Sequence, residues 1–511
     1  MRNFSGILTS HTEKMPHKEA LVYGSRRITY AELNKDTHAF ASALRQLDVC
    51  KDDRVALLLY NCPEFLVAAF AINRLGAVFV PMNYRLASDE VKFILEDSGA
   101  KVLITEHELR PTVDPILSGI QSLKAFIALD GPGDVGLKYA EMIESHRGQE
   151  VIDAVVSESD LHRVVYTSGT TARPKGVMLS YANLYSKNDA HREVLHLTSE
   201  DRVLVAGPLY HVGGMDLPFT GVLQLGGTGV ILRKFNVDAC LDAIVKEMVT
   251  IVWLAPTMMN MILNNLEVKN LNFNSLRLII DGGEKMPEDR VNKVLDIFTN
   301  VWFADAYGLT ETLSGDTFLT KDKMSMKIGS VGKPVPNLEL RIVDENERQL
   351  PPNQPDEIVL KGQKVFKGYW NNAEATRIAM KDGWFHTGDV GYLDDEGFLY
   401  VVDRKKDMIK SGGENIASVE IERVIYHHPK ILEAAVVAAP DEQWGEVPAA
   451  YVVPKKNMQI KPDELARFIG ESLAKFKIPK HFFFLTQLPR NPSGKVLKAD
   501  LRLEARKILT H

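Results

Sequence analysis

Eleven residues, 166–176, combine hydroxyl, glycine and cationic side chains in a pattern suited to binding phosphate. Apolar runs at 161–165 and 177–179 flank them, which indicates a loop between two strands. Backbone N–H groups, hydroxyls and an ammonium in such a loop can surround a polyphosphate. The common nucleotide-binding loop has a glycine directly before its lysine, where this chain has Pro174. We therefore predict a polyphosphate loop of another class, with contacts from Thr167, Ser168, Gly169, Thr170, Thr171 and Lys175.

The composition is that of a globular protein without an excess of positive charge. The chain has 511 residues, of which 45% are hydrophobic and 25% charged, and a formal net charge of −6. Because single hydrophobic cores stop growing near ~250–300 residues, we expect more than one domain. A nucleic-acid-binding protein would be expected to present a basic face, so the negative charge argues against that partner.

The cysteines indicate a reduced compartment, and the apolar segments predict neither a signal peptide nor a transmembrane helix. The chain has an odd number of cysteines, and none of them has C-x-x-C spacing; they are Cys50, Cys62 and Cys240. The N-terminus lacks the apolar stretch of a signal peptide. The most apolar region, 55–82, is interrupted by polar and charged residues, so it does not predict a transmembrane segment. We expect a cytoplasmic protein, and both a peripheral membrane contact and a homodimer stay open.

Strands and helices alternate on both sides of the loop, which predicts parallel sheets covered by helices. Before the loop we expect strands at 27–30, 55–60, 77–80 and 102–104, with helices at 31–44, 63–75 and from Ser88, whose side chain should cap its helix. After the loop we expect strands at 203–206, 229–232, 251–253, 276–280 and 301–304, with helices at 237–248 and 287–298.

The last third of the chain has a different pattern. Short strands with glycine and proline turns begin near Gly329, which predicts a small β-rich subdomain at about 315–403. A charge run at 403–407 then marks the boundary to a C-terminal α+β domain, 404–511, with helices at 418–428 and 462–473 and strands at 434–438 and 449–453. The predicted fold class is thus α/β, with a large N-terminal domain (1–403) of mostly parallel, helix-covered sheets and a small C-terminal domain.

Together with the loop, five further segments occur in the order found in adenylate-forming enzymes, namely acyl-CoA synthetases, luciferases and peptide-synthetase adenylation domains. They are 307–312 (YGLTET), 329–334 (GSVGKP), 384–389 (WFHTGD), 403–415 (DRKKDMIKSGGEN) and 489–495 (PRNPSGK). The resemblance spans nearly the whole chain, and the chain looks most like the fatty-acyl- and aryl-CoA ligases. It implies that a carboxylate attacks the α-phosphorus of ATP to give an acyl-adenylate and pyrophosphate. The thiol of coenzyme A then displaces AMP.

The resemblance also implies which residues hold the nucleotide. Glu311 would bind Mg²⁺, which takes oxygen donors and bridges phosphates, and Thr310 would contact the α-phosphate. Asp389 would accept hydrogen bonds from the ribose hydroxyls, with Arg404 as the second ribose contact. Adenine would lie against an aromatic shelf and a neighbouring strand end, formed by Tyr307, Gly308, Gly283 and Glu284.

Two positions depart from the family pattern. Ala172 stands where the family usually has glycine, and because alanine at positive φ costs ~1 kcal/mol or more, we expect φ < 0 there. Glu284 and Lys285 follow the glycine pair where a small residue is usual. We expect these two charges to pair and point outward, and recognition of a polar group is the alternative.

Lys495 would stabilise the transient oxyanion and the α-phosphate as a mobile point charge. In the resembled family a mobile C-terminal domain turns about a pivot two residues after the ribose arginine, here Lys406. One orientation would bring Lys495 to the site. The other would bring the loop with Ser411, Gly412 and Gly413 to the pantetheine thiol, with Lys475 and Lys477 near the coenzyme A phosphates.

Residues 208–214 resemble the segment that forms one wall of the acyl pocket. His211 would lie near the carboxylate and take part in catalysis. An apolar lining with room for an aliphatic chain or a ring would come from Gly213, Gly214, Met215, Thr257 and Ala306. Asp216, if it points inward, would suit a substrate with a positive charge.

The leading hypothesis is an ATP-dependent carboxylate–CoA ligase that uses Mg²⁺, with a medium- or long-chain fatty acid or an aryl acid as substrate. The alternative is an adenylation enzyme that loads an acyl or aminoacyl group onto a carrier protein. Amino-acid versions have an aspartate early in the pocket wall, where this chain has Tyr210 and His211. A non-catalytic nucleotide-binding relative is disfavoured because Lys495, Glu311 and Asp389 are all present. A luciferase-type oxidation stays open.

Overall fold

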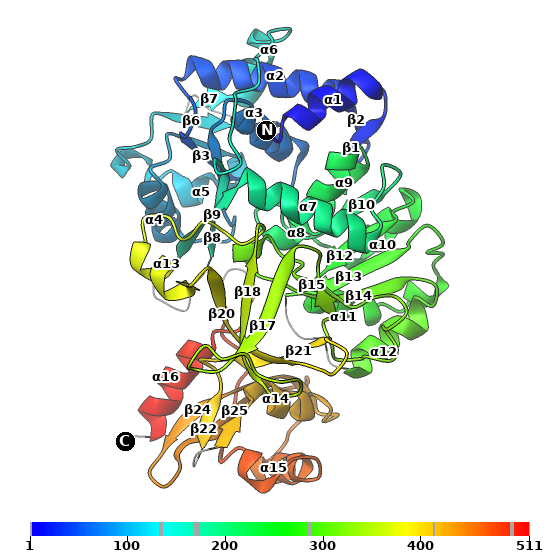
Figure 1. Cartoon of the computed structure of the whole chain (residues 1–511), viewed down its shortest axis with the longest axis vertical. Coiled ribbons are helices and arrows are strands. Elements are labelled where there is room, and N and C mark those ends of the chain that lie inside the picture. The colour runs from blue at the N-terminus through cyan, green and yellow to red at the C-terminus, as the bar shows by residue number, and fades with distance from the viewer. Residues whose placement is uncertain are drawn as a thin grey trace. The chain divides into compact units, whose positions relative to one another are not determined.

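The computed structural model describes residues 3–131, 136–167, 174–283, 286, 288–411, 414–490 and 495–509 (Figure 1). The chain forms two compact units. The first comprises Met1–Glu339 and Leu360–Phe385, and the second comprises Leu340–Val359 and His386–His511.

The first unit contains a seven-stranded sheet with the order β7-β6-β5-β3-β4-β8-β9. Its strands are β3 (Arg54–Leu58), β4 (Val78–Pro81), β5 (Val102–Thr105), β6 (Ala125–Ala128), β7 (Leu137–Lys138), β8 (Leu161–Thr167) and β9 (Lys175–Ser180). Neighbouring strands are parallel except for the β8–β9 hairpin. Buried aliphatic side chains of β3, β4 and β5 pack against helix α4 (Ser88–Ser98).

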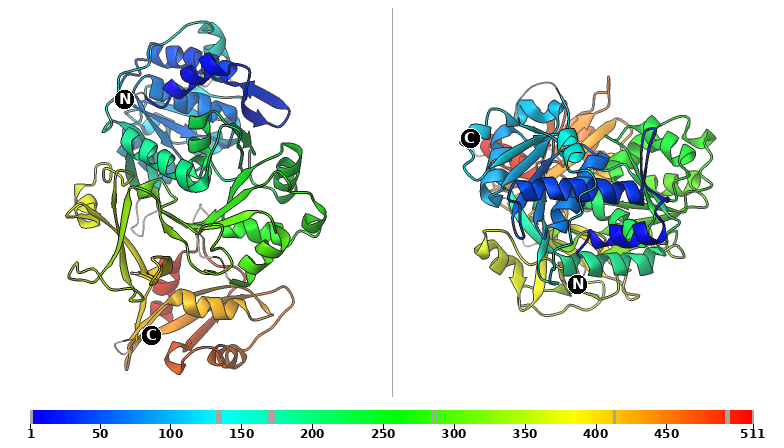
Figure 2. Two further views of the ribbon diagram at one scale, coloured as in Figure 1. Left: turned by 45° about the vertical axis from the view of Figure 1, so that its right-hand side comes forward. Right: turned by 90° about the horizontal axis from the view of Figure 1, so that it is seen from above.

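A nine-stranded sheet in the same unit has the order β16-β15-β14-β13-β12-β10-β11-β1-β2. Its strands are β1 (Glu19–Tyr23), β2 (Arg26–Thr29), β10 (Arg202–Val205), β11 (Thr228–Ile231), β12 (Ile251–Leu254), β13 (Leu278–Gly282), β14 (Trp302–Tyr307), β15 (Thr317–Phe318) and β16 (Lys333–Pro334). The strands from β14 to β1 are parallel, and the outer ones are antiparallel. Helices α10 (Val237–Lys246), α11 (Pro256–Leu263) and α12 (Glu288–Ile297) pack on one face of this sheet (Figure 2).

Local sequence signals explain where several helices begin. Helix α2 (Tyr30–Gln46) starts with a capping box, in which the Thr29 hydroxyl accepts from the Glu32 N–H at 3.2 Å and the Glu32 carboxylate accepts from the Thr29 N–H. Pro63 occupies the first turn of α3 (Pro63–Arg74). The remaining helices of this unit are α1 (Gly6–Lys14), α5 (Arg110–Val113), α6 (Tyr139–Ser145), α7 (Tyr181–Leu195), α8 (Val212–Asp216), α9 (Phe219–Leu225) and α13 (Ala373–Ala379).

A five-stranded sheet has the order β17-β18-β20-β19, with β21 paired to β20. Its strands are β17 (Leu338–Val343), β18 (Asp356–Gly362), β19 (Met380–Lys381), β20 (Trp384–Leu393) and β21 (Leu399–Arg404). Strands β17, β18 and β20 each contribute residues to both units.

The second unit also contains a five-stranded sheet built on the long β24–β25 hairpin. Its elements are β22 (Ile409–Ser411), β23 (Glu414–Ile416), α14 (Ser418–Tyr426), β24 (Ile431–Asp441), β25 (Gly445–Pro454), α15 (Pro462–Gly470), β26 (His481–Phe484) and α16 (Lys498–Leu509). Because side chains alternate along a strand, β24 supplies two cores. Ala434 and Val436 pack with α14 and α15, whereas Ala435 and Val437 pack with α16.

The predicted fold class is confirmed, including the mostly parallel sheets and the α+β C-terminal region. One local prediction is wrong: Ser88 is the first helical residue of α4, and the capping position belongs to Ala87. The Glu90 carboxylate accepts from the Ala87 N–H at 2.9 Å, so this acid performs the function expected of the serine. The strand predicted at 276–280 lies two residues later, and α7 was not anticipated.

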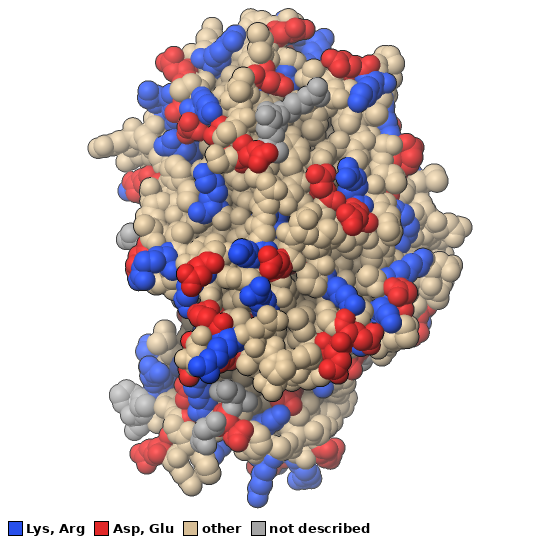
Figure 3. Space-filling view, viewed as in Figure 1, with Lys and Arg blue, Asp and Glu red and all other residues tan. Residues whose placement is uncertain are grey.

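Charged side chains of both signs are interspersed over the described surface that Figure 3 shows. None of the helices among the described residues has the length and apolar composition needed to cross a bilayer.

Candidate functional site

The carboxyl ends of four neighbouring parallel strands bring predicted site residues together. Strands β14, β13, β12 and β10 are adjacent in that order. Tyr307 ends β14, Gly283 follows β13, Thr257 is exposed in the helix after β12, and His211 lies in the connection after β10. Open parallel sheets bind ligands at this edge of the strands. The sheet order therefore collects predicted adenine and acyl contacts at one edge.

Glycines at this edge allow close backbone packing. Gly282 pairs with Ala306, and a Cβ added to Gly282 would lie 2.7 Å from the Ala306 carbonyl oxygen. A Cβ on Gly308 would lie 2.4 Å from the backbone nitrogen of Gly315. Gly283 is exposed and has φ +102°, a conformation that favours glycine. A side chain at Gly282 or Gly308 would force the backbone apart.

His211 immediately precedes α8, and its Nδ1 accepts a hydrogen bond from the Gly213 N–H at 3.0 Å. Its ring lies nearly parallel to the buried Trp253 indole, at 24° and 6.4 Å between centroids. A Cβ on Gly207 or Gly213 would lie 2.4 or 2.6 Å from that indole. The predicted pocket wall is therefore packed against Trp253, for which the sequence pattern predicts only a place in a strand.

Gly214 and Met215 are buried within α8. A Cβ on Gly214 would lie 2.3 Å from the Pro208 carbonyl oxygen, which explains the need for glycine. The Met215 sulfur lies 3.1 Å from Nη1 of Arg163.

Asp216 points inward, and its charged partners belong to the chain itself. It pairs with Arg163 and lies 3.7 Å from the Lys187 ammonium, and all three side chains are at most 1% exposed. Lys187 also donates to the Asp216 carbonyl and to the Thr220 hydroxyl. Burial lowers the pKa of Lys187 to about 7, although Asp216 opposes the shift. Because Asp216 is compensated in this way, we do not propose a cationic substrate.

The β8–β9 hairpin fixes both ends of the predicted phosphate loop. Thr167 pairs with Lys175, and Tyr166 pairs with Gly176. Ser168, Gly169, Thr170, Thr171 and Ala172 lie outside the described residues, as do Glu284 and Lys285.

Tyr369, which is not among the predicted site residues, lies between two of them. The Tyr369 hydroxyl donates to Oε1 of Glu311 at 2.8 Å, and the Lys175 ammonium lies 5.0 Å from the centre of the Tyr369 ring. Glu311 is in the 3₁₀ turn η4 (Thr310–Thr312), which packs against β9. No sequence signal marks Tyr369, because it is 58 residues from Glu311 along the chain.

A buried ion pair supports the backbone that follows Glu311. Asp316 lies 2.7 Å from the Lys364 ammonium and accepts from the Thr312 hydroxyl at 2.6 Å. Lys364 also donates to the carbonyls of Ser314 and Gly315. Residues 313–315 all have positive φ, so these bonds hold a left-handed turn directly after η4.

The donor set at this turn is compatible with magnesium. Among the described residues, no group of three or more acidic, histidine or cysteine side chains could enclose a metal ion. Mg²⁺ characteristically needs only one or two carboxylates, with phosphates and water completing its octahedron. The Glu311 carboxylate with the adjacent Thr310 hydroxyl is an oxygen-only set of that kind.

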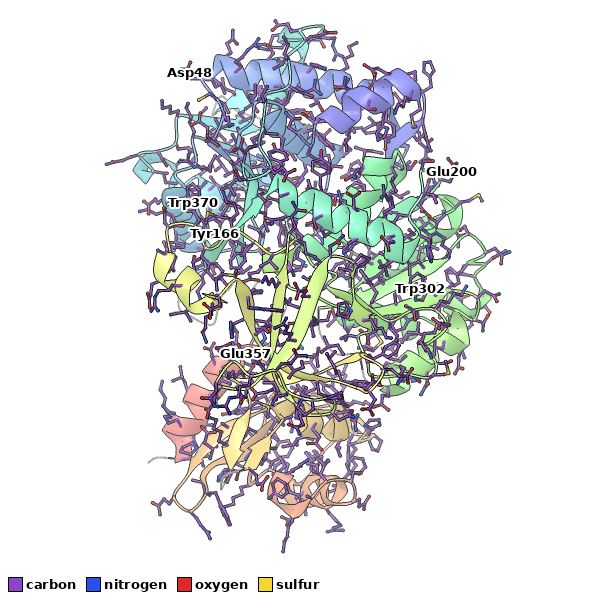
Figure 4. All side chains as sticks on the ribbon, in the orientation of Figure 1. Asp48, Tyr166, Glu200, Trp302, Glu357 and Trp370 are labelled. Carbon is purple, nitrogen blue, oxygen red and sulfur yellow. The ribbon has the colours of Figure 1, made fainter. Side chains whose placement is uncertain are left out.

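In the second unit, Asp389 and Arg404 face each other across β20 and β21, with 3.5 Å between Arg404 Nε and Asp389 Oδ1. Gly388 has φ +71°, and its N–H donates to Glu357, labelled in Figure 4. Burial raises the pKa of Glu357, but the hydrogen bond from Lys405 and the nearby His386, whose Nδ1 lies 3.2 Å from Oε2, outweigh it and hold this pKa at about 2.

The other predicted residues of this unit occupy turns and short strands. Lys406 is exposed in the turn closed by the Asp407 N–H and the Arg404 carbonyl at 2.8 Å. Lys495 is exposed beside the Arg490–Val496 bridge. Ser411 is buried in β22, and Gly412 and Gly413 lie outside the described residues. Lys475 is exposed, and Lys477 donates to both carboxylate oxygens of Glu420.

Comparison with known proteins identifies the family. Residues 8–370 match the AMP-binding enzyme family, and residues 420–495 match the AMP-binding enzyme C-terminal domain. A feruloyl-CoA synthase from Amycolatopsis sp. is 38% identical over 95% of this chain and 96% of its own length. An indoleacetate–CoA ligase from Aromatoleum aromaticum is 37% identical over 97% of both chains.

Solved structures agree with these sequence matches. The o-succinylbenzoate CoA synthetase of Bacillus subtilis, in complex with its acyl-adenylate intermediate, has a TM-score of 0.89 at 34% identity over 98% of both chains. The same synthetase in complex with ATP and a magnesium ion has a TM-score of 0.87 at 33% identity, over 98% of this chain and 99% of that one. The chain therefore belongs to the AMP-binding family of adenylate-forming enzymes, among its acid–thiol ligases.

Proposed function

We propose that this ligase activates an acid with an aromatic ring and transfers it to coenzyme A through an acyl-adenylate. The observation that carries the proposal is the packing of the acyl-wall segment 208–214, and of Gly207 directly before it, against the Trp253 indole, with the His211 ring nearly parallel to that indole. A bulky indole beside this wall makes the acyl pocket less deep for a long alkyl chain. It also gives the pocket an aromatic surface that can pack against the ring of a substrate. Fatty acids are the competing substrate class.

The assignment of the nucleotide contacts rests on the family and on the strand-edge geometry. Lys175 and the loop before it would contact the phosphates, and Thr310 and Glu311 would contact the α-phosphate and Mg²⁺. Bound Mg²⁺ would supply charge neutralisation between the phosphates. Tyr307 and the glycines Gly283 and Gly308 would line the adenine site, and Asp389 with Arg404 would hold the ribose.

Both half-reactions depend mainly on positioning and charge neutralisation. Lys495 would serve adenylate formation. A turn about Lys406 would replace it with the Ser411–Gly413 loop for thioester formation. Lys475 and Lys477 are the proposed contacts for the coenzyme A phosphates, where Lys477 would have to leave Glu420 or share it. Three free thiols support the proposal of a reduced, cytoplasmic setting.

The decisive experiment measures pyrophosphate and AMP release with aryl, arylalkyl, medium-chain and long-chain acids, each with and without coenzyme A. We expect the largest kcat/KM for an acid with an aromatic ring, and sustained turnover only with coenzyme A. A preference for long-chain fatty acids would contradict the proposed substrate class. Turnover that needs a carrier protein in place of coenzyme A would favour the alternative enzyme class.

A matched pair of variants tests the role of the indole. Trp253→Phe should change the relative kcat/KM of aromatic and fatty acids by about tenfold, because removing part of a pocket wall alters fit. Trp302→Phe alters another buried tryptophan of the same sheet, which donates to the Leu319 carbonyl. It should leave the preference unchanged, and equal shifts in both variants would count against the pocket assignment.

A further inference from the structure

The segment from Phe366 to Trp370 joins the phosphate-loop hairpin to the Thr310–Thr312 turn. The Phe366 N–H donates to the Glu311 carbonyl at 2.7 Å. The Met178 N–H donates to the Gly368 carbonyl, and the Trp370 N–H donates to the Gly176 carbonyl. This segment, the 366–370 strap, thus has backbone bonds to both partners.

Side chains tie the same strap down further. The Trp370 indole N–H donates to the Asp97 carbonyl at 3.0 Å, and the Tyr166 hydroxyl donates to the carboxylate of Asp97. Figure 4 shows Tyr166 and Trp370 close together. Gly368 has φ +127°, and a Cβ there would lie 2.7 Å from the Thr376 side chain, so this position of the strap requires glycine.

Tyr369 projects from this fixed strap to two groups of opposite charge. Its hydroxyl donates to Glu311, and its ring faces the Lys175 ammonium. In the first contact the Tyr369 hydroxyl is the donor and the Glu311 carboxylate is the acceptor, at 2.8 Å. Hydrogen bonds to carboxylates are stronger than neutral ones, and a cation over an aromatic face is attracted to it.

We propose that Tyr369 is a positioning residue that orients the Glu311 carboxylate for the metal and the Lys175 ammonium for the phosphates. The inference rests on the proposed roles of Glu311 and Lys175. Beyond those roles, we infer that one side chain orients the carboxylate and the ammonium before nucleotide binds. This lowers the free energy needed to arrange the two groups during adenylation.

The test separates the two contacts of Tyr369 by calorimetric titration of ATP with excess Mg²⁺ and with EDTA. Tyr369→Phe keeps the ring over Lys175 and removes the bond to Glu311. It should lower the gain in ATP affinity from Mg²⁺ by about tenfold, the scale of one hydrogen bond to a charged group, and leave affinity in EDTA unchanged. Tyr369→Leu removes both contacts and should also weaken ATP binding in EDTA by about threefold.

Tyr30→Phe is the matched control, because it removes a buried tyrosine hydroxyl that donates to the Gly227 carbonyl and not to the strap or its partners. It should leave the magnesium gain at the wild-type value. A wild-type magnesium gain in Tyr369→Phe, or an equal loss in Tyr30→Phe, would overturn the inference and leave the proposed function standing. If the wild-type enzyme binds ATP equally well with Mg²⁺ and with EDTA, that result would overturn both the inference and the proposed role of Glu311. If Tyr369→Leu fails to fold, Tyr369→Phe decides alone.

Discussion

Two aspartate–arginine pairs, one chosen from each unit of the molecule, differ in almost every physical respect. Asp216 and Arg163 are 0% and 1% exposed, and Lys187 and Thr220 complete their surroundings. Asp389 and Arg404 are 10% and 38% exposed, and their nearest charged atoms are 3.5 Å apart. The first pair is enclosed by protein, whereas the second has an arginine in contact with solvent.

This difference indicates which charges can take part in chemistry. A buried ion pair is costly to break, because either partner alone is left without solvation. A partly exposed pair at longer distance loses little on changing partners. We therefore expect substitutions in the Arg163–Asp216–Lys187 cluster to lower the free energy of unfolding. Substitutions of exposed charges in the second unit should instead lower the rate of catalysis.

The largest effect should follow from removing the buried carboxylate. Asp216→Ala leaves Arg163 and Lys187 without their counter-ion and should destabilise the protein by about 3–5 kcal/mol. Urea unfolding measures this change. Asp189→Ala is the control, since its partner Arg192 is 3.7 Å away and both side chains are about half exposed. Its effect should stay within ~0.5 kcal/mol, and similar losses in both variants would break the comparison.

Lys495→Ala should show the opposite pattern, with a large catalytic effect and no loss of stability. Adenylate formation should fall at least ~100-fold, the usual scale for one charge-stabilising group. Thioester formation from preformed adenylate should change far less. Single-turnover assays of the two half-reactions distinguish them, with Lys507→Ala on the exposed face of α16 as control. Equal loss of both half-reactions would remove Lys495 from this role.

Glu357 provides an intermediate case, because it is mostly buried yet bonded to the exposed Lys405. Its folded-state pKa of about 2 lies below the ordinary value of 4.5, so its contribution to stability is present above pH 4.5. That contribution is lost as the pH falls from 4.5 through 2, by about 3 kcal/mol, since each pKa unit is worth ~1.4 kcal/mol. Denaturant midpoints measured against pH should show this slope in the wild type and a smaller one in Glu357→Gln. Identical slopes would contradict it.

The smallest effect is expected at the proposed pivot. Lys406→Pro stiffens the exposed turn at 404–407 and should slow thioester formation about tenfold while sparing adenylation. Lys406→Ala, which keeps the backbone free, should behave as the wild type. The half-reactions are again measured in single turnover, and unchanged thioester formation in the proline variant would place the pivot elsewhere.

Elements with strong local signals were predictable. The uninterrupted apolar runs at β3 and β12 predicted buried strands, and Pro63 marked the start of α3. The prediction that Ser88 caps α4 was wrong because the Glu90 carboxylate, in the first turn of this helix, accepts from the Ala87 N–H at its N-terminus. Helix α7 was missed because its inward face carries polar groups such as Lys187 and Asn188, which bond within the protein.

The sequence by itself determined the family, the αβ alternation and the order of the motifs, because these depend on local propensity and on residue types at fixed spacing. Tertiary structure alone decided which side chains meet. Tyr369 reaches Glu311, Lys364 reaches Asp316 and Trp253 fills the space beside Gly213. Such partners come from segments that are distant along the chain. Local sequence patterns do not determine the order of strands in a sheet, so they do not predict which of these segments meet.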